Sequence, residues 1–424
     1  SRCSCSRCRF SDALSSLSES LPEHRKIAAR NEKQKMKKMM RYFCAAAAAL
    51  LCTVLLLLPC AAEGEDDGRL LPAPEMPEGI DDFLAAVPDE VTELLPDGFF
   101  SGDAAGMSDA LRRASSADYL INTALGIVGG GIGDALRSFC TLVGLALAAA
   151  VLGCVRESLP SRGMTGALEL AVNTAAAVAA VGTQYLRFEA VGTYFERQRM
   201  IMSSLLPLMG VLYAMGGNSG GAVLNNSTVL LWLELINLFA TALLMPAVAV
   251  MTALSLAGAF LPGVRTSGLS KFIGKTVGTV LGLAAVLLGT ALGAQNVLTA
   301  SGDKLGFRTA KFVAGSMIPV VGSTVGDSLR TLAASVGMLR STVGVSGIVV
   351  LILLLLPTLL SLLLSRLSFS AAAGVADMLG SGELARFYRD MSSVYGLLIA
   401  AAALSALMFV FALTVFALTA AATA

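Results

Sequence analysis

The sequence predicts an all-α fold, a polytopic α-helical membrane protein with six to eight transmembrane helices after a cleaved signal peptide. Of its 424 residues, 55% are hydrophobic and only 14% are charged, and the mean hydropathy is +0.73. Soluble domains carry about 25% charged residues. The apolar residues also gather in long runs, and a run of about 20 residues is enough to cross a bilayer as a helix. This composition excludes an ordinary soluble enzyme.

The net charge of +1 hides three regions of different character. Residues 1–41 carry a net charge of +7, residues 63–118 carry −12, and residues 119–424 carry +6. A basic head, an acidic segment and a sparsely charged apolar body indicate three different environments. The chain has no long basic stretch with interleaved aromatic residues, so we expect the lipid bilayer and no nucleic acid as its surroundings.

The head of the chain has the order of parts that is typical of a secretory signal peptide. A positive stretch at Lys37, Lys38 and Arg41 precedes the apolar run 44–58, and small residues follow it. We therefore predict a signal peptide over residues 36–62; an uncleaved anchor is the alternative. Residues 1–35 are then an extension of the gene model or a disordered tail.

The acidic segment 63–118 follows the predicted cleavage site and is broken by several prolines. We interpret it as an acidic extracytoplasmic arm with one or two short helices. Two roles stay open for it, a solvated linker and a docking segment for a partner. Residues 119–424 form the predicted polytopic membrane domain.

Seven apolar runs follow in the membrane domain. One of them, residues 227–260, is longer than a single span needs and carries Pro246, so it is either a tight helical hairpin or one long broken helix. The charged stretch 187–199 is expected to separate two spans. The seven runs are 139–155, 164–186, 200–216, 227–260, 276–296, 343–365 and 393–424.

Two carboxylates lie inside these apolar runs, each with an asparagine on the same helix face. Asn173 follows Glu169 by four residues, and Asn237 follows Glu234 by three. An ionisable group in a bilayer usually faces a bundle interior or an aqueous cavity. These four residues are possible membrane-embedded polar sites. An ion pathway and simple hydrogen bonding between helices are both open.

Two patterns indicate packing against other helices. In the amphipathic segment 325–340, apolar residues recur with a spacing of three or four, which suits a partner-docking stripe or an interfacial helix. Small residues at a spacing of four let membrane helices approach closely. The stripe consists of Val325, Leu329, Leu332, Val336 and Leu339, and the helix-packing glycines are Gly274, Gly278 and Gly282.

Catalytic groups are scarce. His24 is the only histidine, and the cysteines at positions 3, 5 and 8 have no fourth ligand nearby to complete a structural zinc site. The glycine-rich stretch 126–134 lacks the spacing of a nucleotide-binding loop. We therefore expect no catalytic residues, no cofactor and no metal, and we expect that the chain is not an enzyme.

Two local stretches resemble the stage III sporulation protein AE family of endospore-forming Firmicutes. One is SSLLPLMGVLYAMGGNSG at 203–220, and the other is AKFVAGSMIPVVGSTVGDSLRTL at 310–332. The order of signal peptide, acidic arm and multiple spans also fits this family. The resemblance covers roughly residue 63 to the C-terminus and carries over no catalytic residues.

This resemblance implies a membrane subunit of the sporulation-specific channel that links the mother cell and the forespore and is needed after engulfment. It implies a multi-pass protein of the mother-cell membrane facing the forespore. The implied partners are other stage III sporulation membrane proteins, a ring-forming protein, a forespore membrane partner and a secretion-type ATPase. A secondary transporter of a small solute is the alternative, although such proteins usually show paired repeats that this chain lacks.

Overall fold

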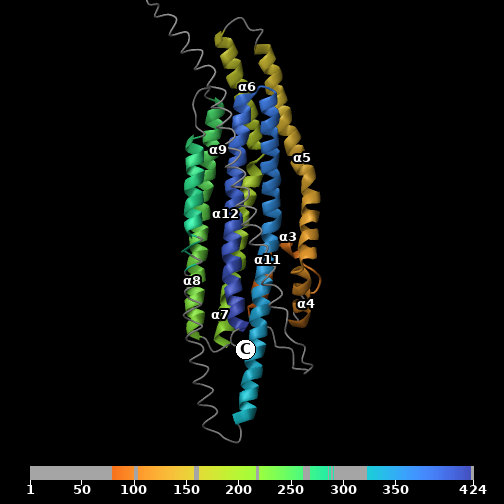
Figure 1. Cartoon of the computed structure of the whole chain (residues 1–424), viewed down its shortest axis with the longest axis vertical. Helices are drawn as coiled ribbons and strands as arrows, with labels where there is room; N and C mark the ends of the chain where they lie inside the picture. The colour runs from red at the N-terminus through yellow and green to blue at the C-terminus, as the bar shows by residue number, and fades with distance from the viewer. Residues whose placement is uncertain are drawn as a thin grey trace, which may run out of the picture. The chain divides into compact units, whose positions relative to one another are not determined.

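The computed structural model describes residues 79–99, 104–156, 162–215, 219–260, 268–284, 286–287, 290 and 322–421. All regular structure in these segments is helical, which confirms the predicted all-α class (Figure 1). The predicted signal peptide over 36–62 and the preceding residues 1–35 lie outside the described residues.

Five helical stretches in the described part of the chain are long and apolar enough to cross a membrane, in agreement with a polytopic membrane protein. The predicted span 276–296 is described only at residues 276–284, 286–287 and 290, where it is helical. The five stretches are Ala117–Gly153, Gly166–Leu212, Val229–Ala259, Ser341–Met378 and Gly382–Thr414.

The second stretch corrects the sequence-based topology. Helices α6 (Arg162–Gly182) and α7 (Tyr185–Met215) do not pack side by side, and only a two-residue turn separates them. The backbone N–H of Arg187 donates to the carbonyl of Gln184 at 3.0 Å, so hydrogen bonding continues across the turn. The prediction that residues 187–199 separate two spans is wrong. These residues are helical and belong to α7, which continues the apolar stretch Gly166–Leu212.

The run 227–260 is one broken helix and not a hairpin. Helix α8 (Ser219–Leu238) passes into a π-helical segment, η2 (Phe239–Leu244), and then into α9 (Met245–Phe260). Helices α8 and α9 do not pack against each other. Pro246 lies just after the π segment, and a proline ring clashes with the carbonyl four residues earlier in a regular α-helix. The wider turn at η2 accommodates this clash.

The most extensive packing joins α11 (Gly322–Met378) and α12 (Gly382–Ala421), which run side by side as a hairpin (Figure 1). At the turn, the N–H of Ser381 donates to the carbonyl of Ala376 at 3.0 Å, and Gly380 has φ +79°. This is the Schellman ending of a helix, which favours glycine because the backbone is left-handed. An ion pair of 2.7 Å between Asp377 and Arg389 closes the hairpin from the side.

The remaining helices pack on this hairpin. Helices α5 (Ala117–Arg156) and α7 lie against α11, and α9 lies against α12. At Gly347 of α11, an added Cβ would come within 2.9 Å of Leu205 and 3.0 Å of Leu413. The three helices α7, α11 and α12 therefore meet closely at this glycine.

Part of the acidic arm also folds onto the bundle. Helix α2 (Ile80–Ala85) contacts α7, whereas α3 (Asp89–Thr92) and α4 (Ala104–Ala114) contact α11. The apolar side chains of the arm are buried: Phe83, Val91, Phe99, Met107 and Leu111 are each less than 5% exposed. The described part of the arm is thus a folded element and not an extended linker.

The helical state of residues 187–199 gives a direct test. Ala190→Pro should lower the free energy of unfolding by about 3 kcal/mol, because proline removes a helical hydrogen bond and clashes with the preceding turn. Thermal unfolding of the purified chain in detergent measures this, with Ala190→Ser as the matched control. If both variants melted like the wild type, residues 187–199 would not be helical.

Candidate functional site

Four polar side chains follow the inward face of the α6–α7 helix, and we call them the polar seam: Gln184, Arg187, Tyr194 and Gln198. Gln184, Tyr194 and Gln198 are at most 2% exposed, and the contacts of Arg187 are partly buried. The spacings of three, seven and four residues place all four on one helix face. Polar groups inside an apolar bundle have to pair with each other or with backbone, and the seam does so with α5, α11 and α12.

The first contact of the seam joins it to α12. The hydroxyl of Tyr395 donates to Oε1 of Gln184 at 2.7 Å, and the amide of Gln184 donates to the hydroxyl of Thr183 at 2.9 Å. The ring of Tyr395 lies between Phe188 and Phe369, with ring centroids 5.6 Å away on both sides. Burial of the rings and the directed hydrogen bond together set the rotation of α12 against α7.

The second contact joins three helices through Arg187. Its guanidinium donates to the hydroxyl of Ser138 on α5 at 3.0 Å and to the hydroxyl of Ser365 on α11. The hydroxyl of Ser365 in turn donates to the carbonyl of Ser361 at 2.7 Å. Arg187 thus donates hydrogen bonds to two neutral hydroxyl groups.

The third contact is buried deepest. The hydroxyl of Tyr194 donates to the carbonyl of Ala402 on α12 at 3.2 Å, and the amide nitrogen of Gln198 donates to the Tyr194 oxygen at 3.3 Å. Oε1 of Gln198 has no hydrogen-bond partner among the described residues. The seam carries hydroxyl, amide and guanidinium groups and no carboxylate, so its chemistry is hydrogen bonding and attraction of anions.

Sequence reasoning missed the seam because it interpreted residues 187–199 as a charged stretch that separates two spans. The exposed charges of this stretch, at Glu189, Glu196 and Arg199, hide the inward residues when the segment is read as a whole. The signal that would have revealed the seam is the regular spacing of Gln184, Arg187, Tyr194 and Gln198, which is that of a helix and not of a loop.

The predicted pair on α6 is only partly described. Asn173 is buried, with 8% of its surface exposed, and α6 packs on α5 and α9. Glu169 lies one turn before it on the same helix, and its side chain lies outside the described residues. An ion pathway through this pair stays a hypothesis.

The predicted pair on α8 faces outward. Glu234 is 61% exposed, and its carboxylate lies 3.6 Å from the guanidinium of Arg199 on α7. Asn237 is half-buried, and its backbone carbonyl accepts a hydrogen bond from Thr241 at 2.8 Å. The structure thus places Glu234 in a link between α7 and α8 and does not bring it together with Asn173.

The predicted stripe lies in the first part of α11, which continues without a break into the apolar run 343–365. Leu339 is buried within the chain, with 4% of its surface exposed. The other four side chains of the stripe lie outside the described residues. Docking of a partner at Val325, Leu329, Leu332 and Val336 stays a prediction.

The predicted glycine face lies on the helix over 268–284. Of its three glycines, only Gly274 packs closely against another described helix of this chain. A Cβ at Gly274 would lie 3.3 Å from the terminal methyl of Met251 on α9. No described atom lies within 4 Å of the Cβ positions of Gly278 and Gly282. The glycine-rich stretch 126–134 lies within helix α5 and forms no nucleotide-binding loop, and a Cβ at Gly131 would lie 3.1 Å from Leu364 of α11.

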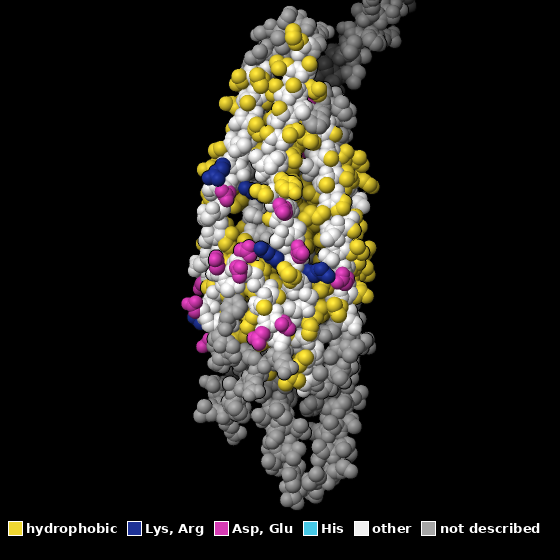
Figure 2. Space-filling model, turned by 180° about the vertical axis from the view of Figure 1, so that it is seen from behind, with side chains coloured by type: hydrophobic (Ala, Val, Ile, Leu, Met, Phe, Trp, Pro, Cys, Tyr) yellow, Lys and Arg dark blue, Asp and Glu magenta, His cyan; other side chains and the backbone are white. Residues whose placement is uncertain are grey.

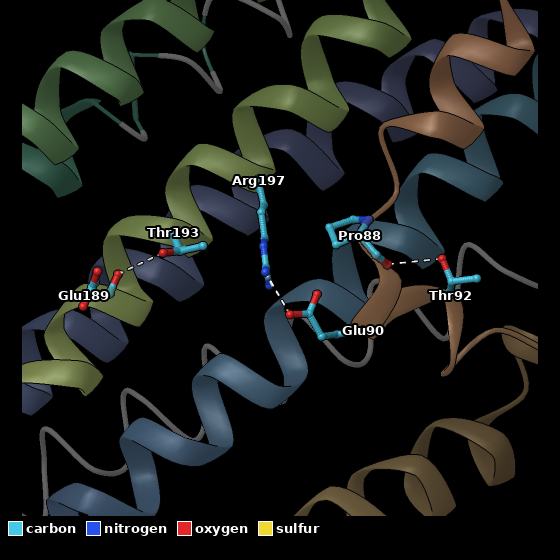
Figure 3. Close-up of polar contacts among 6 residues, drawn as sticks. All are labelled: Pro88, Glu90, Thr92, Glu189, Thr193 and Arg197. Carbon is cyan, nitrogen blue, oxygen red and sulfur yellow. Dashed lines mark hydrogen bonds and ion pairs between the residues drawn. The ribbon is translucent and has the colours of Figure 1, made fainter.

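An ion pair joins the arm to the bundle next to the seam. Oε1 of Glu90 on α3 lies 2.8 Å from the guanidinium of Arg197 on α7 (Figure 3). A hydrogen bond from its own backbone N–H and the attraction of Arg197 hold the pKa of the Glu90 carboxyl below its usual value. Residues 79–99 carry six carboxylates and no basic residue.

Charged side chains gather in one part of the molecular surface. Figure 2 shows most acidic and basic side chains of the visible face across its middle and lower part, with hydrophobic side chains above them. Within the described segments, no group of three or more His, Cys, Asp or Glu side chains could hold a metal ion.

The buried contact between Tyr395 and Gln184 gives a prediction on stability. Tyr395→Phe should lower the free energy of unfolding by about 1–3 kcal/mol, because it leaves a buried amide oxygen without a donor. In a double-mutant cycle with Gln184→Met, the coupling between the two positions should be on the order of 1 kcal/mol. Tyr185→Phe, at a position that is 68% exposed, is the control and should be neutral.

The contact between Glu90 and Arg197 gives a prediction that depends on pH. Glu90→Gln should speed hydrogen exchange of the arm amides about twofold to fivefold at pH 7, a small effect because Glu90 is exposed and Arg197 is only half-buried. Because the folded pKa is lowered, the contribution of Glu90 exists above its unfolded pKa and is lost as pH falls through the folded pKa. Below the folded pKa of Glu90, the difference in exchange rate between Glu90→Gln and the wild type should vanish. Glu93→Gln is the control and should leave the exchange rates unchanged both at pH 7 and below that pKa.

Comparison with known proteins identifies the family. The profile of the Stage III sporulation protein AE family (spore_III_AE) matches residues 107–420. The chain is 28% identical over 232 residues to a stage III sporulation protein AE of Bacillus subtilis (strain 168), in an alignment that covers 53% of this chain and 57% of that relative. No solved structure matches the chain. Because the family profile covers most of the chain, the protein belongs to the stage III sporulation protein AE family.

Proposed function

We propose that this protein is a non-enzymatic membrane subunit of the channel complex that links the mother cell and the forespore during sporulation. Membership of a sporulation family supports a role in this process. The five long apolar helices support a place in a membrane. The location in this proposal is the mother-cell membrane that faces the forespore.

The observation that carries the proposal is the exposed apolar surface of helices that are longer than a bilayer needs. Helix α11 has 57 residues, which corresponds to about 85 Å, whereas a hydrocarbon core is about 30 Å thick. Helix α5 has 40 residues, about 60 Å, and its side chains Leu125 and Leu136 are 62% and 58% exposed. Such helices extend beyond the hydrocarbon core, where apolar surface requires another protein.

This surface supports assembly with other membrane chains. The partners that we propose are other stage III sporulation membrane proteins, a ring-forming protein, a forespore membrane partner and a secretion-type ATPase. The polar seam supports the non-enzymatic part of the proposal, because it joins helices α5, α7, α11 and α12 by hydrogen bonds and offers neither a nucleophile with a base nor paired carboxylates.

Deletion of the gene in the organism that carries it should block spore development after engulfment and leave vegetative growth unchanged. Fluorescence microscopy of membrane-stained sporulating cells and counts of heat-resistant spores measure this. A wild-type copy expressed at another locus should restore spore formation and is the control.

Two other outcomes would contradict the proposal. Normal spore formation in the deletion strain would remove the sporulation role. A growth defect that depends on one nutrient, with the chain purified free of other sporulation proteins, would instead support a secondary transporter of a small solute.

A further inference from the structure

Helix α5 carries an exposed ion pair halfway along a stretch that is apolar enough to cross a membrane. Asp134 and Arg137 lie 3.8 Å apart on the 37-residue stretch Ala117–Gly153, and their side chains are 73% and 84% exposed. Apolar side chains before the pair are also uncovered. The exposed fractions lie between 51% and 62% for Ile121, Leu125, Ile132 and Leu136.

Wherever the bilayer lies along α5, part of this surface is in an unfavourable medium. The helix is about 60 Å long and a hydrocarbon core is about 30 Å thick, so lipid covers about half of it. A bilayer centred on the helix puts the ion pair in hydrocarbon, where charge is costly. A bilayer over the second half leaves the apolar side chains of the first half in water. A bilayer over the first half does the same to Leu147 and Val151, which are 53% and 59% exposed. A protein segment that covers α5 removes this conflict.

The outward face of α5 has a shape that suits a second helix. Gly126, Gly130 and Gly133 share this face with Arg137, because they follow one another at spacings of four, three and four residues. No described atom lies within 4 Å of the Cβ positions of the three glycines. Small residues at such spacings let membrane helices approach closely. A helix that packs here covers the glycine backbone and lies next to the ion pair.

The charges at this face select a second copy of the same chain. A partner helix with charge of one sign would attract one member of the Asp134–Arg137 pair and repel the other. A second α5 brings one charge of each sign. Two parallel helices related by a two-fold axis each offer a carboxylate to the arginine of the other copy. The glycines of the two copies then lie at the same height, so their flat surfaces meet.

We propose that two copies of this chain associate through the outward face of α5. The glycines at 126, 130 and 133 form the contact, and Asp134 and Arg137 attract their counterparts across it. A two-fold contact uses the same patch on both copies, so it closes with two chains. This association does not depend on the function proposed above, since a dimer can form whether or not the chain belongs to the channel complex.

The molar mass of the full chain in a mild detergent, measured by light scattering over a concentration series, tests the proposal. The wild type should form a dimer. Gly130→Leu should weaken dimerisation about tenfold or more, because leucine holds the two helices apart. Gly278→Leu is the matched control: no described atom lies within 4 Å of its Cβ position either, and it lies on the helix over 268–284. It should leave the dimer unchanged.

Charge reversal separates pairing between copies from simple damage to the helix. Arg137→Asp leaves only negative charge at the contact on both copies, so it should weaken dimerisation about tenfold or more. The double variant Asp134→Arg with Arg137→Asp restores one charge of each sign, and it should recover most of the dimer. Failure of this double variant to recover the dimer would contradict the charge pairing. If Gly130→Leu does not fold, these charge variants decide.

Cys140 provides a second readout in native membranes. It lies seven residues after Gly133 on the same helix face and is exposed. Oxidation should link two chains through Cys140, as identified by mass spectrometry of the linked peptides, and Cys140→Ser should abolish this link. A monomer at every concentration would overturn the proposal, and so would a dimer that Gly130→Leu and Arg137→Asp leave unchanged. A link from Cys140 to a different protein would assign this face to another chain.

Discussion

The pairing of α11 with α12 is the contact on which the other helices depend. The hairpin closes through the left-handed turn at Gly380 and the ion pair between Asp377 and Arg389. The hairpin is the surface on which the other helices are arranged, because α5 and α7 pack along α11 and α9 packs along α12. Helices α7, α11 and α12 approach one another closely at Gly347, where an added Cβ would lie 2.9 Å from Leu205 and 3.0 Å from Leu413.

Polar contacts then select one arrangement of these apolar helices. In lipid, apolar surfaces on different helices are nearly interchangeable, so hydrogen bonds and close packing decide which faces meet. Tyr388 donates to the carbonyl of Leu142 at 2.9 Å, and Ser368 donates to the carbonyl of Ala135 at 3.1 Å, so both fix α5. The seam on α7 fixes the same hairpin from another side. These groups therefore specify the register of the bundle more than any chemistry.

The folded arm changes how the outer face of the bundle is understood. Its carboxylates require water, yet its apolar side chains are buried and Glu90 bonds to Arg197 of α7. The face of α7 under the arm is thus not exposed to lipid, although its sequence lies within an apolar stretch of 47 residues. The ion pairs of Arg197 with Glu90 and of Arg199 with Glu234 both place charge along α7.

The sequence by itself determined the all-α membrane class and the family. Composition and long apolar runs are local properties, and they do not depend on which helices pack against each other. It also indicated that residues 227–260 were too long for one simple span. Only the tertiary structure decided that this run is one broken helix, that residues 187–199 are helical, and that Glu234 faces outward. The polar seam depends on Tyr395 and Ala402, which lie about 200 residues further along the chain. A charged stretch is a loop or a helix according to whether such partners cover one of its faces, and no local pattern contains that information.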